Sequence, residues 1–322
     1  MKYDVVALGE LLIDFTNNGV SEQGNPMFEA NPGGAPCNVL SMLSKLGKKA
    51  AFIGKVGDDA FGRQLEDAIR EVGIESKGLC KDKEVNTTLA FVLKLPNGDR
   101  DFSFYRKPGA DMMLSKDDLD MDIIRNTRIF HFGTLSMTDD ICREATKLAI
   151  DEAVKAGATV SFDPNLREPL WKSLDEAKEQ VAYGLSKCNI LKISDNEILW
   201  FTGKDDYDEG IEVLKKDYPN ISLILLSMGP DGSRAYYKNM KVEVPAVLRD
   251  NTIETTGAGD TFCGCMLNYI LDNGLTDLSE DNLREMLTYA NMGASIITIR
   301  KGALRVMPTK EEIEEELSKK NS

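Results

Sequence analysis

Short apolar runs alternate with segments of helical length along most of this chain, and no other feature of the sequence constrains the fold as strongly. Runs of strand length occupy residues 5–8, 50–53, 128–132, 159–162, 189–193 and 221–227. Segments of helical period occupy residues 35–46, 62–72 and 139–156, and a glycine follows each of them. Strands separated by such helices predict right-handed crossovers and a mostly parallel sheet with helices on both faces, which is an α/β fold.

Two stretches interrupt this alternation. Residues 86–106 predict a β-hairpin, because β-rich segments flank the turn residues 96–99 (PNGD), and Asn-Gly is typical of tight hairpin turns. Residues 16–32 are polar and lack a helical period. Together the two stretches predict a small β flap that stands off the main sheet, over a site at the strand ends. Residues 310–320 predict a charged helix with a solvated face.

The charge balance limits the partners of this chain. It carries 39 Lys and Arg residues against 53 Asp and Glu residues, a formal net charge of −14. Such acidity argues against a nucleic-acid binder and against an anionic membrane surface, but a local site can still be positive and bind small anions. The sequence has neither an apolar run of membrane-spanning length nor a signal peptide, and its six cysteines form no Cys-x-x-Cys pair, so we expect reduced thiols and a cytoplasmic location.

The segment that carries the most informative chemistry is Gly257-Ala258-Gly259-Asp260, which precedes an apolar run of helical length. A glycine turn that opens a helix leaves backbone N–H groups unpaired, and these donors bind anions such as phosphate. Asp260 lies at the mouth of this turn, although a capping aspartate is the ordinary alternative. Neither a GxxxxGK[ST] loop nor a GxGxxG motif occurs, so this turn is the best candidate anion site in the sequence.

A second candidate region lies near the N-terminus. Asp14 follows the first apolar run, and Gly33-Gly34 opens a helical segment that carries Asn38. A carboxylate and a carboxamide at the strand ends suit a polyol, because each can form two hydrogen bonds with neighbouring hydroxyl groups. An ordinary loop-to-helix turn is the alternative interpretation of the two glycines.

These segments together resemble a known family. Residues 33–38 (GGAPCN) and 255–260 (TTGAGD) look like the two motifs of the ribokinase-like sugar kinases, the PfkB family, and residues 163–167 (DPNLR) extend the resemblance. It covers nearly the whole chain and is greatest to fructokinases. It implies a three-layer αβα sandwich in one domain, with a mostly parallel sheet and a small β-sheet lid formed by about residues 15–32 and 86–108.

The resemblance implies ATP-dependent phosphorylation of a sugar hydroxymethyl group. Asp260 would be the catalytic base, and Gly257, Ala258 and Gly259 would form the anion hole with it. The implied sugar or phosphate contacts are Asp14, Gly33, Gly34, Asn38, Arg106 and Arg167. The implied nucleotide contacts are Ser227, Gly229, Gly232 and Asn291. D-Fructose, giving fructose 6-phosphate, is the first candidate substrate; ribose, 2-keto-3-deoxygluconate and a nucleoside or riboside stay open, as does a binding protein without catalysis.

The same resemblance implies ATP with Mg²⁺, and it leaves K⁺ open. The family's Asn-x-x-Glu motif here reads Ser194-Asp195-Asn196-Glu197, so Glu197 is the candidate for a water-mediated contact to magnesium. Glu254 stands where the family commonly has Asp beside a monovalent-cation loop. The expected partners are the sugar and ATP, without nucleic acid or membrane, and the family's lid often forms a homodimer interface.

Overall fold

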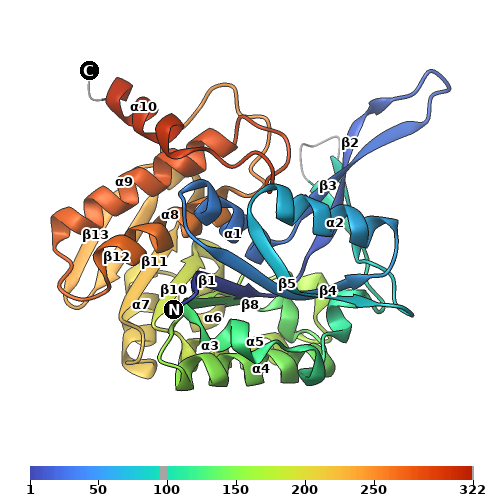
Figure 1. Ribbon diagram of the computed structural model, residues 1–322. Coiled ribbons are helices and arrows are strands. Elements are labelled where there is room, and N and C mark those ends of the chain that lie inside the picture. The colour runs from blue at the N-terminus through green and yellow to red at the C-terminus, as the bar shows by residue number, and fades with distance from the viewer. Residues whose placement is uncertain (95–99, 321–322) are drawn as a thin grey trace.

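The computed structural model describes residues 1–94 and 100–320, whose strands form one large sheet and one small sheet (Figure 1). In spatial order the nine described strands of the large sheet are β13 (Met240–Val244), β12 (Ser233–Tyr237), β11 (Leu223–Ser227), β10 (Ile190–Ser194), β9 (Thr159–Asp163), β8 (Thr127–Gly133), β1 (Tyr3–Leu8), β4 (Ala50–Gly57) and β5 (Ile74–Asp82). Neighbouring strands are parallel from β11 to β5, whereas β12 and β13 add an antiparallel hairpin at one edge. The predicted, mostly parallel sheet is confirmed.

Helices cover both faces of the large sheet, as Figure 1 shows. On one face are α1 (Ala35–Lys45), α2 (Ala60–Glu71), α8 (Ala258–Asn273), α9 (Glu280–Ile297) and α10 (Lys310–Lys320). On the other face are α3 (Met121–Arg125), α4 (Asp140–Lys155), α5 (Leu174–Lys187), α6 (Asp195–Thr202) and α7 (Tyr207–Asp217). Short 3₁₀ helices occupy η1 (Ala110–Met113), η2 (Lys116–Asp118), η3 (Leu135–Met137), η4 (Glu168–Leu170) and η5 (Gly229–Asp231).

The two faces of the sheet have separate hydrophobic cores. In the interior strand β1, Val5 and Ala7 join the core under α1 and α8, while Val6 and Leu8 join the core over α4 and α5. All four side chains are fully buried. A strand that is buried on both faces must be apolar at every position, which explains why β1 appears in the sequence as a continuous apolar run. This arrangement confirms the three-layer sandwich.

The small sheet has the order β3 (Pro26–Gly33), β2 (Leu12–Val20), β6 (Leu89–Lys94) and β7 (Arg100–Tyr105). β6 and β7 are antiparallel, which confirms the predicted hairpin, while its turn at residues 96–99 lies outside the described residues. β2 and β3 form a second hairpin, and β2 pairs in parallel with β6. Figure 1 shows this sheet, the lid, projecting from the body.

An aromatic cluster attaches the lid to the body. Phe15 of β2 stacks on Phe91 of β6, with 4.7 Å between ring centroids. Phe61 of α2 meets the same Phe15 ring edge-on at 5.6 Å. Such pairs contribute about 0.5–1.5 kcal/mol each beyond their buried area, so the base of the lid is fixed on α2.

Two helix starts differ from the rest, and both lie beyond the strand ends. α2 and α5 begin at polar caps, where Asp59 accepts a hydrogen bond from the Gly62 backbone and Ser173 from the Glu176 backbone. In α1 and α8 the capping residue is a glycine, and these two described helices have no side-chain cap. Their first-turn N–H groups therefore remain for other partners. No helix in the described part of the chain is both long and apolar enough to span a bilayer.

Candidate active site

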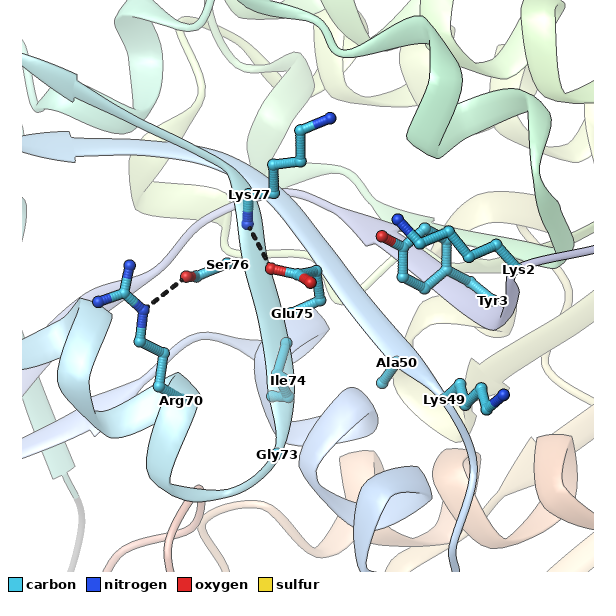
Figure 2. Close-up of a pocket in the computed structure, with 10 residues that line it drawn as sticks. All are labelled: Lys2, Tyr3, Lys49, Ala50, Arg70, Gly73, Ile74, Glu75, Ser76 and Lys77. Carbon is cyan, nitrogen blue, oxygen red and sulfur yellow. Dashed lines mark hydrogen bonds between the residues drawn. The ribbon is translucent and has the colours of Figure 1, made fainter.

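Two hollows lie at opposite ends of the parallel strands. The larger, of about 740 Å³, lies at the amino ends of β1, β4 and β5 and is drawn in Figure 2. Basic side chains, among them Lys2, Lys49 and Arg70, line it, and Arg70 already donates a hydrogen bond to Ser76. The smaller hollow, of about 310 Å³, lies beyond the carboxyl ends, where open α/β sheets bind their ligands. It is lined by most of the residues predicted for catalysis and for the sugar, and we take it as the candidate active site.

The start of α8 forms one wall of this pocket. Gly257 caps the helix with φ of 78°, in the left-handed region that favours glycine, and a Cβ there would lie 2.7 Å from Ala303 Cβ. Gly259 and Asp260 follow in the first turn, where backbone N–H groups have no acceptor within the helix. The turn therefore presents donors and the positive end of the helix dipole to the pocket. The role of this turn as an anion hole stays a prediction.

A hydrogen bond at Asp260 connects the two predicted motifs, residues 33–38 and 255–260. Asp260 Oδ2 accepts a hydrogen bond of 2.8 Å from Asn38 Nδ2 of α1, although 222 positions separate these residues in the sequence. Burial raises the pKa of Asp260 above its ordinary value, whereas the Asn38 hydrogen bond and the positive charges of Lys192 and Arg167 lower it. A buried carboxylate of raised pKa is a stronger base than an exposed one, which suits proton abstraction from an alcohol.

Asp14 of β2 lies in the same pocket beside the two glycines that precede α1. Burial raises the pKa of Asp14 to about 7; Arg167 opposes this shift, and the negative charges of Glu254 and Asp260 add to it. A side chain at Gly33 would collide with the Asp14 carboxylate. The pair is therefore more than an ordinary loop-to-helix turn, because one of its glycines leaves room for the Asp14 carboxylate.

Gly34 itself has φ of 126°, and a Cβ at this position would collide with a backbone oxygen of the loop after β1. Of the predicted sugar contacts, Asp14, Gly34, Asn38 and Arg167 line the pocket. Gly33 lies directly behind Asp14. The structure thus brings five of the six predicted positions together.

Arg106 is the exception, and its predicted contact with sugar or phosphate is not what the structure shows. The side chain is buried, and its Nε and Nη2 bind Asp111 at 2.7 Å. Nη1 donates to Thr138 and Nη2 to the backbone oxygen of Leu135. Asp111 also accepts from Thr88 Oγ1 at the start of β6. Every guanidinium nitrogen therefore has a partner. Through these contacts Arg106 and Asp111 attach the end of β7 and the start of β6 to the body of the protein.

The four residues predicted for the nucleotide do not line this pocket. They lie at the end of β11, in the segment that follows it, and on α9. Ser227 ends β11, Gly229 begins η5 with φ of 53°, and Gly232 follows with φ of 104°. Asn291 of α9 is buried; its Oδ1 accepts from Ser233, and its Nδ2 donates to the backbone oxygens at 244 and 245. Its amide holds the end of β13, and the nucleotide roles of these four residues stay predictions.

The predicted ion-binding carboxylates are tied to the backbone. Glu197 Oε2 accepts from the Ser194 backbone and hydroxyl at 2.8 Å, forming a capping box, and Oε1 accepts from the Leu166 backbone at 2.7 Å. Within the described residues no cluster of three or more His, Cys, Asp or Glu could hold a metal ion. Magnesium carried by phosphates and water, with Glu197 nearby, fits this arrangement. Glu254 Oε1 accepts from the Gly302 backbone at 2.6 Å, which joins two loops beside the pocket.

Sequence reasoning missed Lys192, which also lines the pocket. It is 7% exposed, and its Nζ lies 2.9 Å from Asp163 Oδ2. The sequence does contain a signal for Lys192, because it is the one charged residue inside the apolar strand β10. Glu10 was also missed as a site residue; it accepts a hydrogen bond of 2.9 Å from the Ala35 backbone at the start of α1. Burial raises the pKa of Glu10 to about 7.

The fold, together with a pocket in which a carboxylate lies beside a glycine turn at a helix start, is typical of one class of enzyme, the α/β phosphotransferases. Comparison with known proteins agrees. A family model described as pfkB family carbohydrate kinase matches residues 2–310. The chain is 42% identical over 307 residues to probable fructokinase-2 of Arabidopsis thaliana, a match that covers 95% of this chain and 93% of that protein. The chain belongs to the pfkB family of carbohydrate kinases.

Solved structures give the same result. A fructokinase from Xylella fastidiosa with bound ATP has a TM-score of 0.91 and 29% identity, over 100% of both chains. A double mutant of the fructokinase from Vibrio cholerae O395, with fructose, ADP and potassium ion bound, has a TM-score of 0.86 and 26% identity, over 98% of both chains. These matches confirm the ribokinase-like fold and the resemblance to fructokinases.

Proposed function

We infer that this protein is an ATP-dependent fructokinase, which converts D-fructose and ATP to fructose 6-phosphate and ADP. The observation that carries this inference is the position of Asp260, a half-buried carboxylate in the first turn of α8, beside the donors of the glycine turn and in contact with Asn38. The names of the similar proteins support fructose as the acceptor.

The proposed reaction proceeds by attack of the fructose hydroxymethyl oxygen on the γ-phosphorus of ATP. A new O–P bond forms as the bond from the γ-phosphorus to the β,γ-bridging oxygen breaks, and ADP leaves with that electron pair. The hydroxyl proton passes to the Asp260 carboxylate. Since such transition states are loose, positioning and charge stabilisation dominate, and the base contributes about 10²–10⁴-fold.

The protein would stabilise the migrating phosphoryl group through the backbone N–H groups of Gly259 and Asp260 and through the dipole of α8. When bound to the ATP phosphates, magnesium neutralises part of their charge. On the acceptor side, Asp14 and Asn38 would fix the sugar hydroxyl groups. Val92 and Phe104 of the lid also line the pocket, so closure of the lid over the sugar would exclude water and limit ATP hydrolysis.

We also propose how the chain assembles, where it is located and how many domains it forms. The lid carries exposed Val20, Met27 and Tyr105, with 63%, 45% and 66% of their surface accessible, which favours a homodimer joined through the lid. All six cysteines are free thiols, which agrees with a cytoplasmic protein. The lid and the body are proposed to form one domain over the whole chain, joined by the aromatic cluster around Phe15.

A coupled assay of ADP release tests the proposed function directly. The purified protein would be assayed with D-fructose, D-ribose, 2-keto-3-deoxygluconate and nucleosides, with and without K⁺. We expect the highest kcat/KM with fructose and a product that glucose-6-phosphate isomerase consumes. A sugar other than fructose with a higher kcat/KM would reassign the substrate, and no ADP release with any sugar would contradict a kinase. The K⁺ series tests the cation role proposed near Glu254.

A further inference from the structure

The pocket would contain more negative charge with ATP bound than the glycine turn alone can balance. Glu10, Asp14 and Asp260 all line it, and ATP brings several further negative charges. Among the described residues that line the pocket, only Lys192 and Arg167 are cations. Charges attract and repel more strongly in a water-poor site than in water. A nucleoside triphosphate therefore needs a fixed positive charge here to offset the repulsion.

Lys192 lies where such a charge would be useful. A Cβ built on Gly259 would be 3.4 Å from its Nζ, so the ammonium group lies beside the second residue of α8. The first-turn N–H groups of that helix face the same pocket. An oxygen of a phosphoryl group bound to those donors would therefore lie in the immediate neighbourhood of Lys192. Arg167, by contrast, is exposed and donates to the backbone oxygen of Leu166.

The surroundings hold Lys192 in place and keep it charged. Its partner Asp163, at the end of β9, has 4% of its side chain exposed. Although burial acts to lower the pKa of Lys192, the negative charges of Asp163 and Glu197 raise it above its usual value. The charge also acts on β8, two strands away from β10 in the sheet, where burial and then Lys192 lower the pKa of His131 to about 3.

We propose that the Lys192 ammonium contacts the γ-phosphoryl group of ATP as it moves to the sugar, and that Asp163 is the positioning residue that aims it. This proposal rests on the proposed kinase function. While the bond to the sugar oxygen forms and the bond to the β,γ-bridging oxygen breaks, Lys192 keeps its own protons and balances the charge on the equatorial oxygens. Asp260, the residue after Gly259, receives the proton of the sugar hydroxyl.

The competing explanation is a buried ion pair that only stabilises the fold. Breaking one partner of such a pair is strongly destabilising, whereas replacing both partners with neutral side chains is often tolerated. The test therefore uses the double variant Lys192→Met/Asp163→Asn, in which no buried charge is left unpaired. A matched control is Lys187→Met/Asp151→Asn, because that pair of α5 and α4 also has an N–O distance of 2.9 Å but is partly exposed, and neither residue lines the pocket.

Two measurements separate the explanations. In the coupled assay we expect the double variant to lose about 10²–10³-fold in kcat, with the fructose KM within about threefold of the parent. In calorimetric titrations without sugar, we expect its affinity for the non-hydrolysable analogue AMP-PNP to fall about tenfold, while its affinity for ADP, which lacks the γ-phosphate, changes little. The control variant should match the parent in both measurements.

A double variant that turns over within about threefold of the parent, or that loses ADP and AMP-PNP affinity equally, would overturn the proposal. If the double variant does not fold, the single variant Lys192→Met is measured in the same two ways, since a lone Asp163 can be protonated in the buried site. The titrations need no sugar turnover. A parent that binds AMP-PNP but phosphorylates no sugar would therefore refute the proposed function while leaving the role of Lys192 testable.

Discussion

Replacing Asp14 with asparagine should stabilise the free protein while it weakens sugar binding. Burial raises the pKa of Asp14 from 3.8 to about 7, so the folded protein holds this proton up to about pH 7. The unfolded chain loses the same proton near pH 4. The contribution of Asp14 to stability therefore becomes more unfavourable as pH rises from about 4 to 7 and stays constant above that range.

The size of the effect follows from the two pKa values. Each tenfold difference in proton affinity is worth about 1.4 kcal/mol, so the titration of Asp14 costs the folded state about 4 kcal/mol at pH 8 and about 1.5 kcal/mol at pH 5. An asparagine side chain would have a similar shape without the charge. Asp14→Asn should therefore raise the free energy of unfolding by about 2–3 kcal/mol more at pH 8 than at pH 5. The fructose KM should rise about 10–100-fold, because hydrogen bonds to a charged group are lost.

Urea denaturation at both pH values, together with fructose kinetics, measures these effects. The control Asp117→Asn changes an exposed aspartate of η2 and should follow the parent at both pH values. A gain in stability that is no larger at pH 8 than at pH 5 would refute the raised pKa of Asp14. An unchanged fructose KM would remove Asp14 from the sugar site.

Three further predictions concern the catalytic base, the lid anchor and the glycine pair. Asp260→Asn should lower kcat by at least about 10²-fold with fructose binding kept, and near-normal turnover would refute its role as base. Arg106→Met should lower the free energy of unfolding by about 3–5 kcal/mol because it leaves Asp111 buried without its cation, and urea denaturation would show this loss shrinking in Arg106→Met/Asp111→Asn. Gly34→Ala should destabilise the protein more than Gly47→Ala, since both glycines have positive φ but only at Gly34 would a Cβ meet a backbone oxygen; equal thermal shifts would contradict that contact.

Local sequence patterns predicted the framework well. The apolar runs became strands of the large sheet, and Gly73 and Gly157 end helices at left-handed positions as expected. The glycine turn before α8 was also predictable, because its chemistry lies in a few consecutive residues. Asn38 and Asp260 were each predicted, but their hydrogen bond became visible only in the fold.

Arg106 and Lys192 show why the rest could not be predicted. Both are basic residues near the site, and their roles depend on which carboxylate the fold brings to them. Arg106 forms a buried ion pair with Asp111 and is not available to bind a ligand. Lys192 forms an ion pair with Asp163, and it lines the pocket. Burial of a charge and the direction of a side chain are set by tertiary packing, which residue type and spacing do not encode.

The most direct test of the account is a crystal structure with fructose and AMP-PNP bound. We expect the γ-phosphate to accept hydrogen bonds from the first-turn N–H groups of α8. We also expect the fructose hydroxymethyl oxygen to lie within about 3 Å of an Asp260 carboxylate oxygen. A γ-phosphate bound away from the glycine turn, or a sugar whose hydroxymethyl group points away from Asp260, would contradict the account.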